Sequence, residues 1–200
     1  MQARSIHGAT RRLIPVAISV LALGCDRSTE PSEPLGELLA QADRVRSAEA
    51  ELAPTAGSAA HGTVEFTAAE GGGVEIVARI EGMPPGTYGI HIHEVGDCSA
   101  SDASSAGDHF SPNDDPHGGP YDPANERHAG DLGNITVDAS GEGQKELTVQ
   151  ELRLEGEHGV VGKAVIVHDG EDDLTSQPSG ESGDPVACGV IESAARRGAA

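Results

Sequence analysis

Across the last two thirds of the chain, apolar and polar residues alternate with the period of two that is typical of β-strands. In 74–82, for example, every second residue from Val74 to Ile80 is apolar. Glycine- and proline-rich turns separate such segments, and this combination predicts an all-β sandwich or barrel. The predicted strands cover residues 61–68, 74–82, 87–95, 133–141, 144–154, 160–169 and 186–193.

The N-terminal 25 residues have the pattern of an export signal. Basic residues precede the apolar run 13–24, which is too short for an ordinary transmembrane helix and suits a signal peptide. The run ends at Cys25, as in a bacterial lipoprotein signal, where the cysteine carries an acyl anchor that holds the protein at a membrane. An ordinary signal peptide with a chance cysteine is the alternative. Both interpretations predict a protein of the bacterial cell envelope, either membrane-anchored or periplasmic.

Residues 26–57 are predicted to form a flexible tether. Its start is polar and contains proline, a composition typical of disorder. Residues 37–52 contain helix formers and an apolar spacing of helical type, so a short helix and a frayed linker both fit them. We therefore expect a folded domain at 58–193 and a frayed tail at 194–200.

Composition and charge limit the core and the partners. Aromatic residues are only 2% of the chain, so the core must consist mainly of Val, Ile, Leu and Ala. The formal net charge is −20 with histidine neutral. Such a surface repels nucleic acid and anionic lipid head groups, and it would also repel an anionic substrate.

Two of the three cysteines lie in the predicted domain. In an exported protein, Cys98 and Cys188 are expected to form a disulfide, and two free buried thiols are the alternative.

Histidines are concentrated between residues 91 and 131. On a strand, His91 and His93 share one face while Ile90 and Ile92 share the other. The long polar loop that follows carries further histidines and ends at Asp131. A single loop histidine is usually a surface residue, but this clustering predicts a metal site, because imidazole and carboxylate are the usual ligands of zinc and copper. The candidate ligands are His91, His93, His109, His117, His128, Asp131 and His168.

Six segments resemble the copper/zinc superoxide dismutase family in order and spacing: GIHIHEVGDC, SAGDHFSP, HGGP, RHAGDLGNI, VVGKAVIVHD and ACGVI. The likeness covers about residues 60 to 192. It implies an eight-stranded Greek-key barrel or immunoglobulin-like sandwich with long metal-binding and electrostatic loops. It also implies an enzyme that disproportionates superoxide to oxygen and hydrogen peroxide. A homodimer is a further possibility that the sequence does not define.

The resemblance assigns a role to each candidate ligand. Copper would be bound by His91, His93, His109 and His168, and zinc by His109, His117, His128 and Asp131. His109 would bridge the two ions and serve as the catalytic proton carrier. Asp172 matches a carboxylate that hydrogen-bonds one copper histidine and one zinc histidine, although a solvated acid in an acidic segment is the alternative. His7, His61 and His158 match no ligand position.

One position departs from the family pattern. The family usually carries an arginine three residues before the cysteine of its ACG motif, and here that position is Pro185. Residues 169–187 contain no Lys or Arg, but they contain six acids. We therefore expect a negative rim and a slowed enzyme, unless Lys163 or Arg127 reaches the channel mouth. Two alternatives are a copper- and zinc-binding envelope protein of the same fold with impaired catalysis, and a structural β domain that binds zinc alone.

Overall fold

The computed structural model describes residues 45–194. The predicted signal peptide with Cys25, residues 26–44 of the tether and residues 195–200 lie outside the described residues. The chain divides into two units, and all described residues belong to the second, Asp43–Ala200. Within the described residues, no helix is long and apolar enough to cross a membrane.

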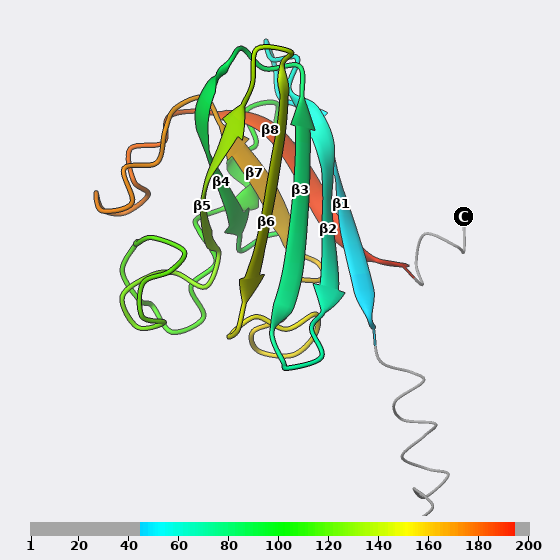
Figure 1. Ribbon diagram of the computed structural model, residues 1–200, viewed down its shortest axis with the longest axis vertical. Helices are drawn as coiled ribbons and strands as arrows, with labels where there is room; N and C mark the ends of the chain where they lie inside the picture. The colour runs from blue at the N-terminus through cyan, green and yellow to red at the C-terminus, as the bar shows by residue number, and fades with distance from the viewer. Residues whose placement is uncertain (1–44, 195–200) are drawn as a thin grey trace, which may run out of the picture. The chain divides into compact units, whose positions relative to one another are not determined.

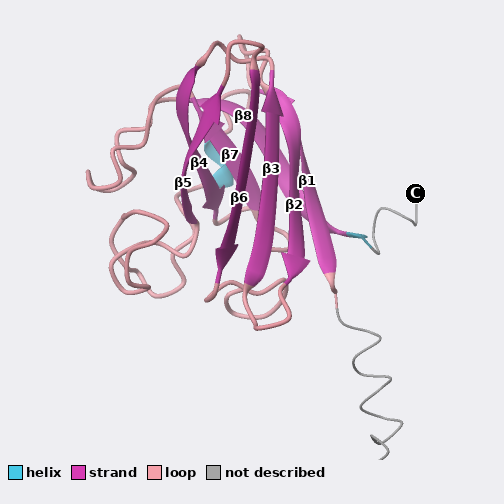
Figure 2. Cartoon of the chain, in the orientation of Figure 1, coloured by secondary structure: helices cyan, strands magenta, loops and turns pink. Residues whose placement is uncertain are grey.

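Eight antiparallel strands close into a barrel (Figure 1). The strands are β1 (Ser47–Pro54), β2 (His61–Ala68), β3 (Val74–Glu81), β4 (Gly86–His93), β5 (Asp131–Val137), β6 (Glu142–Val149), β7 (Ala164–His168) and β8 (Pro185–Ser193). Their order around the barrel is β1-β2-β3-β6-β5-β4-β7-β8, in which β3–β6 and β4–β7 are neighbours that are not consecutive in the chain. This is a Greek-key arrangement. Figure 2 shows loops over nearly all of the remaining described residues. The predicted all-β, eight-stranded Greek-key barrel is confirmed.

The first strand, β1, lies where the sequence predicts a tether with a short helix, and the helix prediction is wrong over 47–52. Strand β1 pairs with β2 and β8 and thereby closes the barrel. Its inward residues Ala48, Ala50 and Leu52 are buried. The alternation is a weak signal in the sequence, because two of its three apolar members are alanine, which also favours helices. The folded domain therefore begins by Ser47, before the predicted boundary at 58.

The strand predicted at 144–154 is too long. Strand β6 ends at Val149. Residues 150–163 form turns and bends, with one isolated β-bridge between Arg153 and Gly159. Leu152 and Leu154 from this loop are nevertheless buried in the core, which explains their strand-like alternation. Burial of every second residue therefore does not by itself require a strand.

Strands β4 and β7 are covered on both faces, and this arrangement prepares the candidate site. The face of β4 with Ile90 and Ile92 joins the barrel core, as the alternation predicts. On the outer side, Ala103 and Ala106 from the loop after β4 pack against Ile166 of β7. All five residues of β7 are buried as a result.

A disulfide between Cys98 and Cys188 fixes the loop after β4 to β8, with the two Cα atoms 5.8 Å apart. The predicted pairing is therefore confirmed. The cross-link spans 90 residues of sequence and holds the loop against the outer face of the barrel wall.

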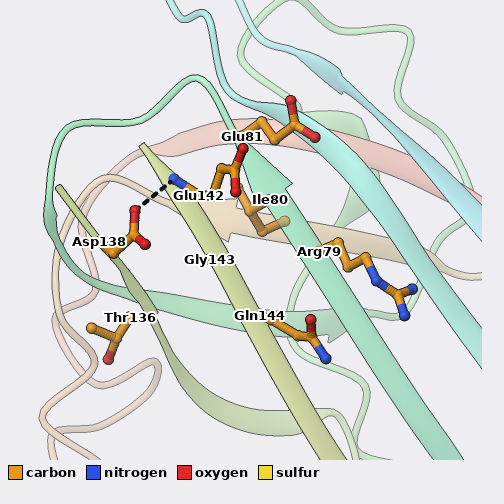
Figure 3. A pocket seen from close by; sticks show the side chains of 8 residues that line it. All are labelled: Arg79, Ile80, Glu81, Thr136, Asp138, Glu142, Gly143 and Gln144. Carbon is orange, nitrogen blue, oxygen red and sulfur yellow. Dashed lines mark hydrogen bonds between the residues drawn. The ribbon is translucent and has the colours of Figure 1, made fainter. Parts of the chain in front are cut away.

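The barrel wall is weakest between β5 and β6, which pair only at Val137 and Gly143. A cleft of about 390 Å³ lies at this opening (Figure 3). Its lining includes the charged side chains Arg79, Glu81, Asp138 and Glu142, and no histidine. The barrel surface therefore carries a charged cleft that is separate from the histidine cluster.

Candidate metal centre

Four histidines converge at one place on the outer face of β4 and β7. Strand β4 supplies His91 and His93, β7 ends at His168, and the loop after β4 supplies His109, which forms an isolated β-bridge with His93. The ring centroids of His91 and His109 are 4.0 Å apart, and those of His91 and His168 are 5.0 Å apart. One nitrogen from each ring lies within 4.8 Å of the others. We call these residues the four-histidine group.

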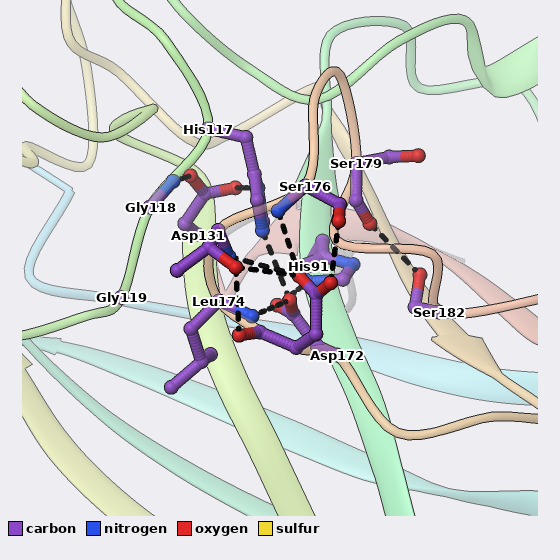
Figure 4. Close-up of polar contacts among 12 residues, drawn as sticks. His91, His117, Gly118, Gly119, Asp131, Asp172, Leu174, Ser176, Ser179 and Ser182 are labelled. Carbon is purple, nitrogen blue, oxygen red and sulfur yellow. Dashed lines mark hydrogen bonds and ion pairs between the residues drawn. The ribbon is translucent and has the colours of Figure 1, made fainter.

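A second group is centred on Asp131, the first residue of β5. Its Oδ1 atom accepts hydrogen bonds from Nδ1 of His109 at 2.8 Å and from Nδ1 of His128 at 3.2 Å. Nδ1 of His117 lies 3.1 Å from the same oxygen. The other carboxylate oxygen accepts the backbone N–H of Gly118 at 3.0 Å (Figure 4). We call His109, His117, His128 and Asp131 the aspartate-centred group. His109 belongs to both groups and uses different nitrogens.

The nitrogens that face the four-histidine group have no hydrogen-bond partner and are buried. They are Nδ1 of His91 and Nε2 of His93, His109 and His168. The opposite nitrogen of each ring donates to an acceptor outside the group. His93 donates to the carbonyl of Gly107 at 2.7 Å, and His168 donates to the carbonyl of Gly183 at 3.0 Å. These donations leave a lone pair on each inward nitrogen, as a metal ion requires.

Asp172 connects the two groups. Its carboxylate accepts from Nε2 of His91 at 2.8 Å and from Nε2 of His117 at 2.9 Å (Figure 4). Its backbone N–H and C=O are both held by the side-chain amide of Asn134 on β5, at 2.8 Å each. Asp172 is 1% exposed, so the alternative of a solvated acid is wrong.

Burial lowers the pKa values of His91, His93 and His168 in the four-histidine group. It lowers the pKa of His93 to about 3 and that of His168 to about 4, with neighbouring imidazoles contributing. The pKa of His91 is also well below its usual value, because burial outweighs the hydrogen bond to Asp172. These three rings are therefore neutral at neutral pH, which is the form that binds metal.

The aspartate-centred group has the opposite electrostatic character. Burial alone would lower the pKa of His117, but Asp131 and Asp172 outweigh it and raise that pKa to about 9. Burial alone would raise the pKa of Asp131, but its histidine neighbours hold that pKa well below the usual range. A proton and a carboxylate therefore neutralise each other here, and a metal ion would have to displace the proton.

A cleft of about 460 Å³ gives access to the shared region, and His93, His109, His128 and His168 line it. The lining also contains four acids, Glu94, Asp108, Asp114 and Asp115. Among the described residues that line the cleft, none is Lys or Arg. The expected acidic rim is present, but its carboxylates come from 94–115 rather than from the acid-rich segment 169–187.

Neither Arg127 nor Lys163 lines the cleft. Arg127 is buried and forms an ion pair with Glu151. The ammonium group of Lys163 lies 3.8 Å from the ring centroid of Phe110. Pro185, at the position where the family usually has arginine, lies instead in a neighbouring cleft with Asp184.

The sequence identifies the candidate ligands and Asp172 but not the groups that orient them. The carbonyls of Gly107 and Gly183 carry no side-chain signal. Asn134 resembles any polar residue of an alternating strand, and Gln177, which binds the backbone of His117, lies in an acidic loop. His61 and His158 join neither group, and His7 lies outside the described residues.

Comparison with known proteins agrees with this geometry. The family model of copper/zinc superoxide dismutase matches residues 60–191. Cu-Zn superoxide dismutase 2 of Mesembryanthemum crystallinum is 38% identical over 136 residues, which cover 65% of this chain and 85% of that protein. A crystal structure of the clock protein EA4 matches with a TM-score of 0.68 and 36% identity, covering 74% of this chain and 96% of that chain. The chain belongs to the copper/zinc superoxide dismutase family, as its motifs indicate.

Proposed function

We propose that this protein is a superoxide dismutase that converts two superoxide anions and two protons into oxygen and hydrogen peroxide. The observation that carries the proposal is the convergence of four buried, unpartnered imidazole nitrogens beside a second group that shares His109. Bound copper supplies the one-electron exchange with superoxide that no side chain of the cleft can perform. An all-nitrogen set suits copper, whereas three nitrogens and one carboxylate suit a closed zinc site.

His109 carries the proton in this proposal. Its Nδ1 faces Asp131 and its Nε2 faces the four-histidine group at the cleft. When it binds no ion, Nε2 can hold a proton and deliver it to a reduced oxygen species in the cleft. Bridging two ions requires the loss of both N–H protons, so proton transfer and metal contact exclude each other at this atom.

The experiment is metal content and superoxide turnover measured on the same preparation of the full chain. We expect one copper, one zinc and turnover above that of free copper. The His109→Ala variant is the control, because it removes the shared ligand. One zinc without copper would support the structural β domain, and both metals without turnover would support the impaired binding protein.

We also propose that the protein captures superoxide slowly, and the acidic lining of the cleft supports this. Superoxide is an anion, and Glu94, Asp108, Asp114 and Asp115 repel it without a compensating Lys or Arg in the described lining. Salt screens repulsion as well as attraction, so the rate should stay constant or rise as ionic strength increases. A rate that falls steeply with salt would contradict slow capture.

The same lining favours a second candidate, a copper- and zinc-binding protein with impaired catalysis, because an acidic mouth attracts cations. For both candidate functions we also propose a location in the bacterial cell envelope and an acyl anchor at Cys25. These two proposals rest only on the sequence pattern of residues 1–25. A homodimer has no contact surface assigned to it among the described residues.

A further inference from the structure

The loop between β7 and β8 contains a segment, residues 174–181, that lies against both metal-capable groups. We call it the strap. A hydrogen bond closes the strap at its base: the N–H of Asp173, the residue just before it, donates to the carbonyl of Gly180 at 2.9 Å. Gly180 of the strap lies against His117 and Asp172, and Figure 4 draws Ser176 and Ser179 together with these residues. Pro178 and Ser179 line the cleft that leads to the four-histidine group.

Gln177 attaches the strap to the backbone of His117. Its Oε1 accepts the N–H of His117 at 2.8 Å, and its Nε2 donates to the carbonyl of His117 at 2.8 Å. The two residues are 60 positions apart in the sequence. The side chain thus satisfies both backbone groups of one residue, as a neighbouring β-strand would. Gln177 is exposed, so this pair of contacts, rather than packing, explains its position.

The strap also approaches the ring of His117. Gly180 has a φ of +68°, and a Cβ atom there would lie 2.6 Å from Nε2 of His117 and overlap the carboxylate of Asp172. The ring therefore has little freedom, since Nε2 donates to Asp172 and Nδ1 lies beside Asp131. With its backbone and its ring both held, His117 presents a fixed nitrogen to the aspartate-centred group.

We propose that Gln177 is a positioning residue for the aspartate-centred group. By fixing the backbone of His117, it raises the affinity of this group for zinc. Because linkage is reciprocal, zinc binding in turn fixes the strap, whose Pro178 and Ser179 line the cleft that leads to the four-histidine group. The inference rests on the proposed function only in taking zinc as the ion.

The test measures zinc affinity of the metal-free full chain by competition with a chromophoric chelator, with zinc as the only added metal. Gln177→Leu keeps a similar volume and removes both hydrogen bonds to His117, together with a longer one from Nε2 to the carbonyl of Thr175 at 3.3 Å. We expect roughly tenfold weaker zinc binding, as for other residues that orient metal ligands. Gln177→Asn keeps a polar amide but is one methylene too short, so it should lose about as much and serves if the leucine variant fails to fold.

Gln144→Leu is the matched control. Gln144 is an exposed glutamine on β6 whose amide donates to Glu146 at 2.6 Å, away from both groups. It should bind zinc as the wild type does, and all variants should melt at about the same temperature without metal. A purely structural role of Gln177 would instead lower the metal-free melting temperature and leave zinc affinity unchanged, which would overturn the inference.

Hydrogen exchange supplies the second readout. Zinc should slow exchange of the strap amides in the wild type and slow it much less in Gln177→Leu. Equal protection in both chains would overturn the inference. A wild-type chain that takes up no zinc overturns the zinc assignment and the inference with it, whereas equal zinc affinity in the wild type and both Gln177 variants overturns the inference alone.

Discussion

The four-histidine group and the aspartate-centred group share His109, but they set the charge of their other imidazoles in different ways. In the four-histidine group, His91, His93 and His168 pass their N–H groups to acceptors outside the group and keep low pKa values. In the other group, a carboxylate lies among the rings, and the pKa of His117 rises to about 9. Without metal, His91, His93 and His168 of the first group are uncharged, whereas the second group contains a protonated His117 beside a carboxylate.

In the proposed function, this difference is what would let one protein distinguish two cations with mostly the same side chain. An all-imidazole set without an internal charge favours a metal that bonds strongly to nitrogen, as copper does. A set with an internal carboxylate offsets the charge of an ion that stays divalent, as zinc does. We therefore expect the metal preference of each group to depend on whether its hydrogen-bond acceptors lie outside or inside the group, more than on the number of histidines.

The largest effect should come from His93→Ala, which removes one nitrogen from the four-histidine group alone. We expect superoxide turnover to fall by about 100-fold or more, because copper loses one of its four nitrogens. Zinc content should be unchanged, because His93 is not in the aspartate-centred group. Equal loss of zinc would show that the two groups do not bind independently.

Asp131→Asn tests the other group. The amide removes the internal charge and faces the Nδ1–H of His109 with a weaker acceptor. Zinc affinity should fall by about 100-fold, and copper should remain bound, as measured by chelator competition with each metal separately. Retention of zinc by this variant would contradict the role of the internal carboxylate.

Asp172→Asn tests the connection between the groups. An amide can accept the N–H of His91 or that of His117, but its NH2 group opposes the other. Both metal affinities should therefore fall, by roughly tenfold each. Loss at one group alone would mean that Asp172 supports that group and does not connect the two.

The folding stability of the metal-free chain should depend on pH in opposite directions for the two groups. Low pKa values of His93 and His168 give stability that is present above about pH 6.5 and is lost as pH falls toward 4. The raised pKa of His117 gives stability that is present below about pH 6.5 and is lost as pH rises toward 9.

The melting temperature of the metal-free chain should therefore be highest near pH 6.5 and fall by on the order of 5 °C on each side. Zinc displaces the proton of His117, so the loss on the alkaline side should disappear when zinc is bound. Calorimetry of the chain with and without zinc measures both effects. A melting temperature that rises steadily to pH 9 without metal would contradict the raised pKa of His117.

The sequence by itself determined the strands with clear alternation and the shared face of His91 and His93. Both follow from local geometry, because successive side chains of a strand point to opposite faces wherever the strand lies. The candidate ligands and Asp172 were identified by motif order, and the structure brings them together in two groups. Alternation failed for β1, where alanine at two of three buried positions left the pattern weak.

Which acceptors hold each imidazole and which acids line the cleft depends on how the distant loops pack in the folded chain. The carbonyl partners from Gly107 and Gly183, the amide of Gln177 and the lining acids of 94–115 come from loops that approach the site when the barrel closes. Backbone carbonyls are the same for every residue type, and the position of a loop depends on contacts with distant strands. Local sequence therefore specifies which side chains are available, whereas long-range packing fixes the direction in which each lone pair points.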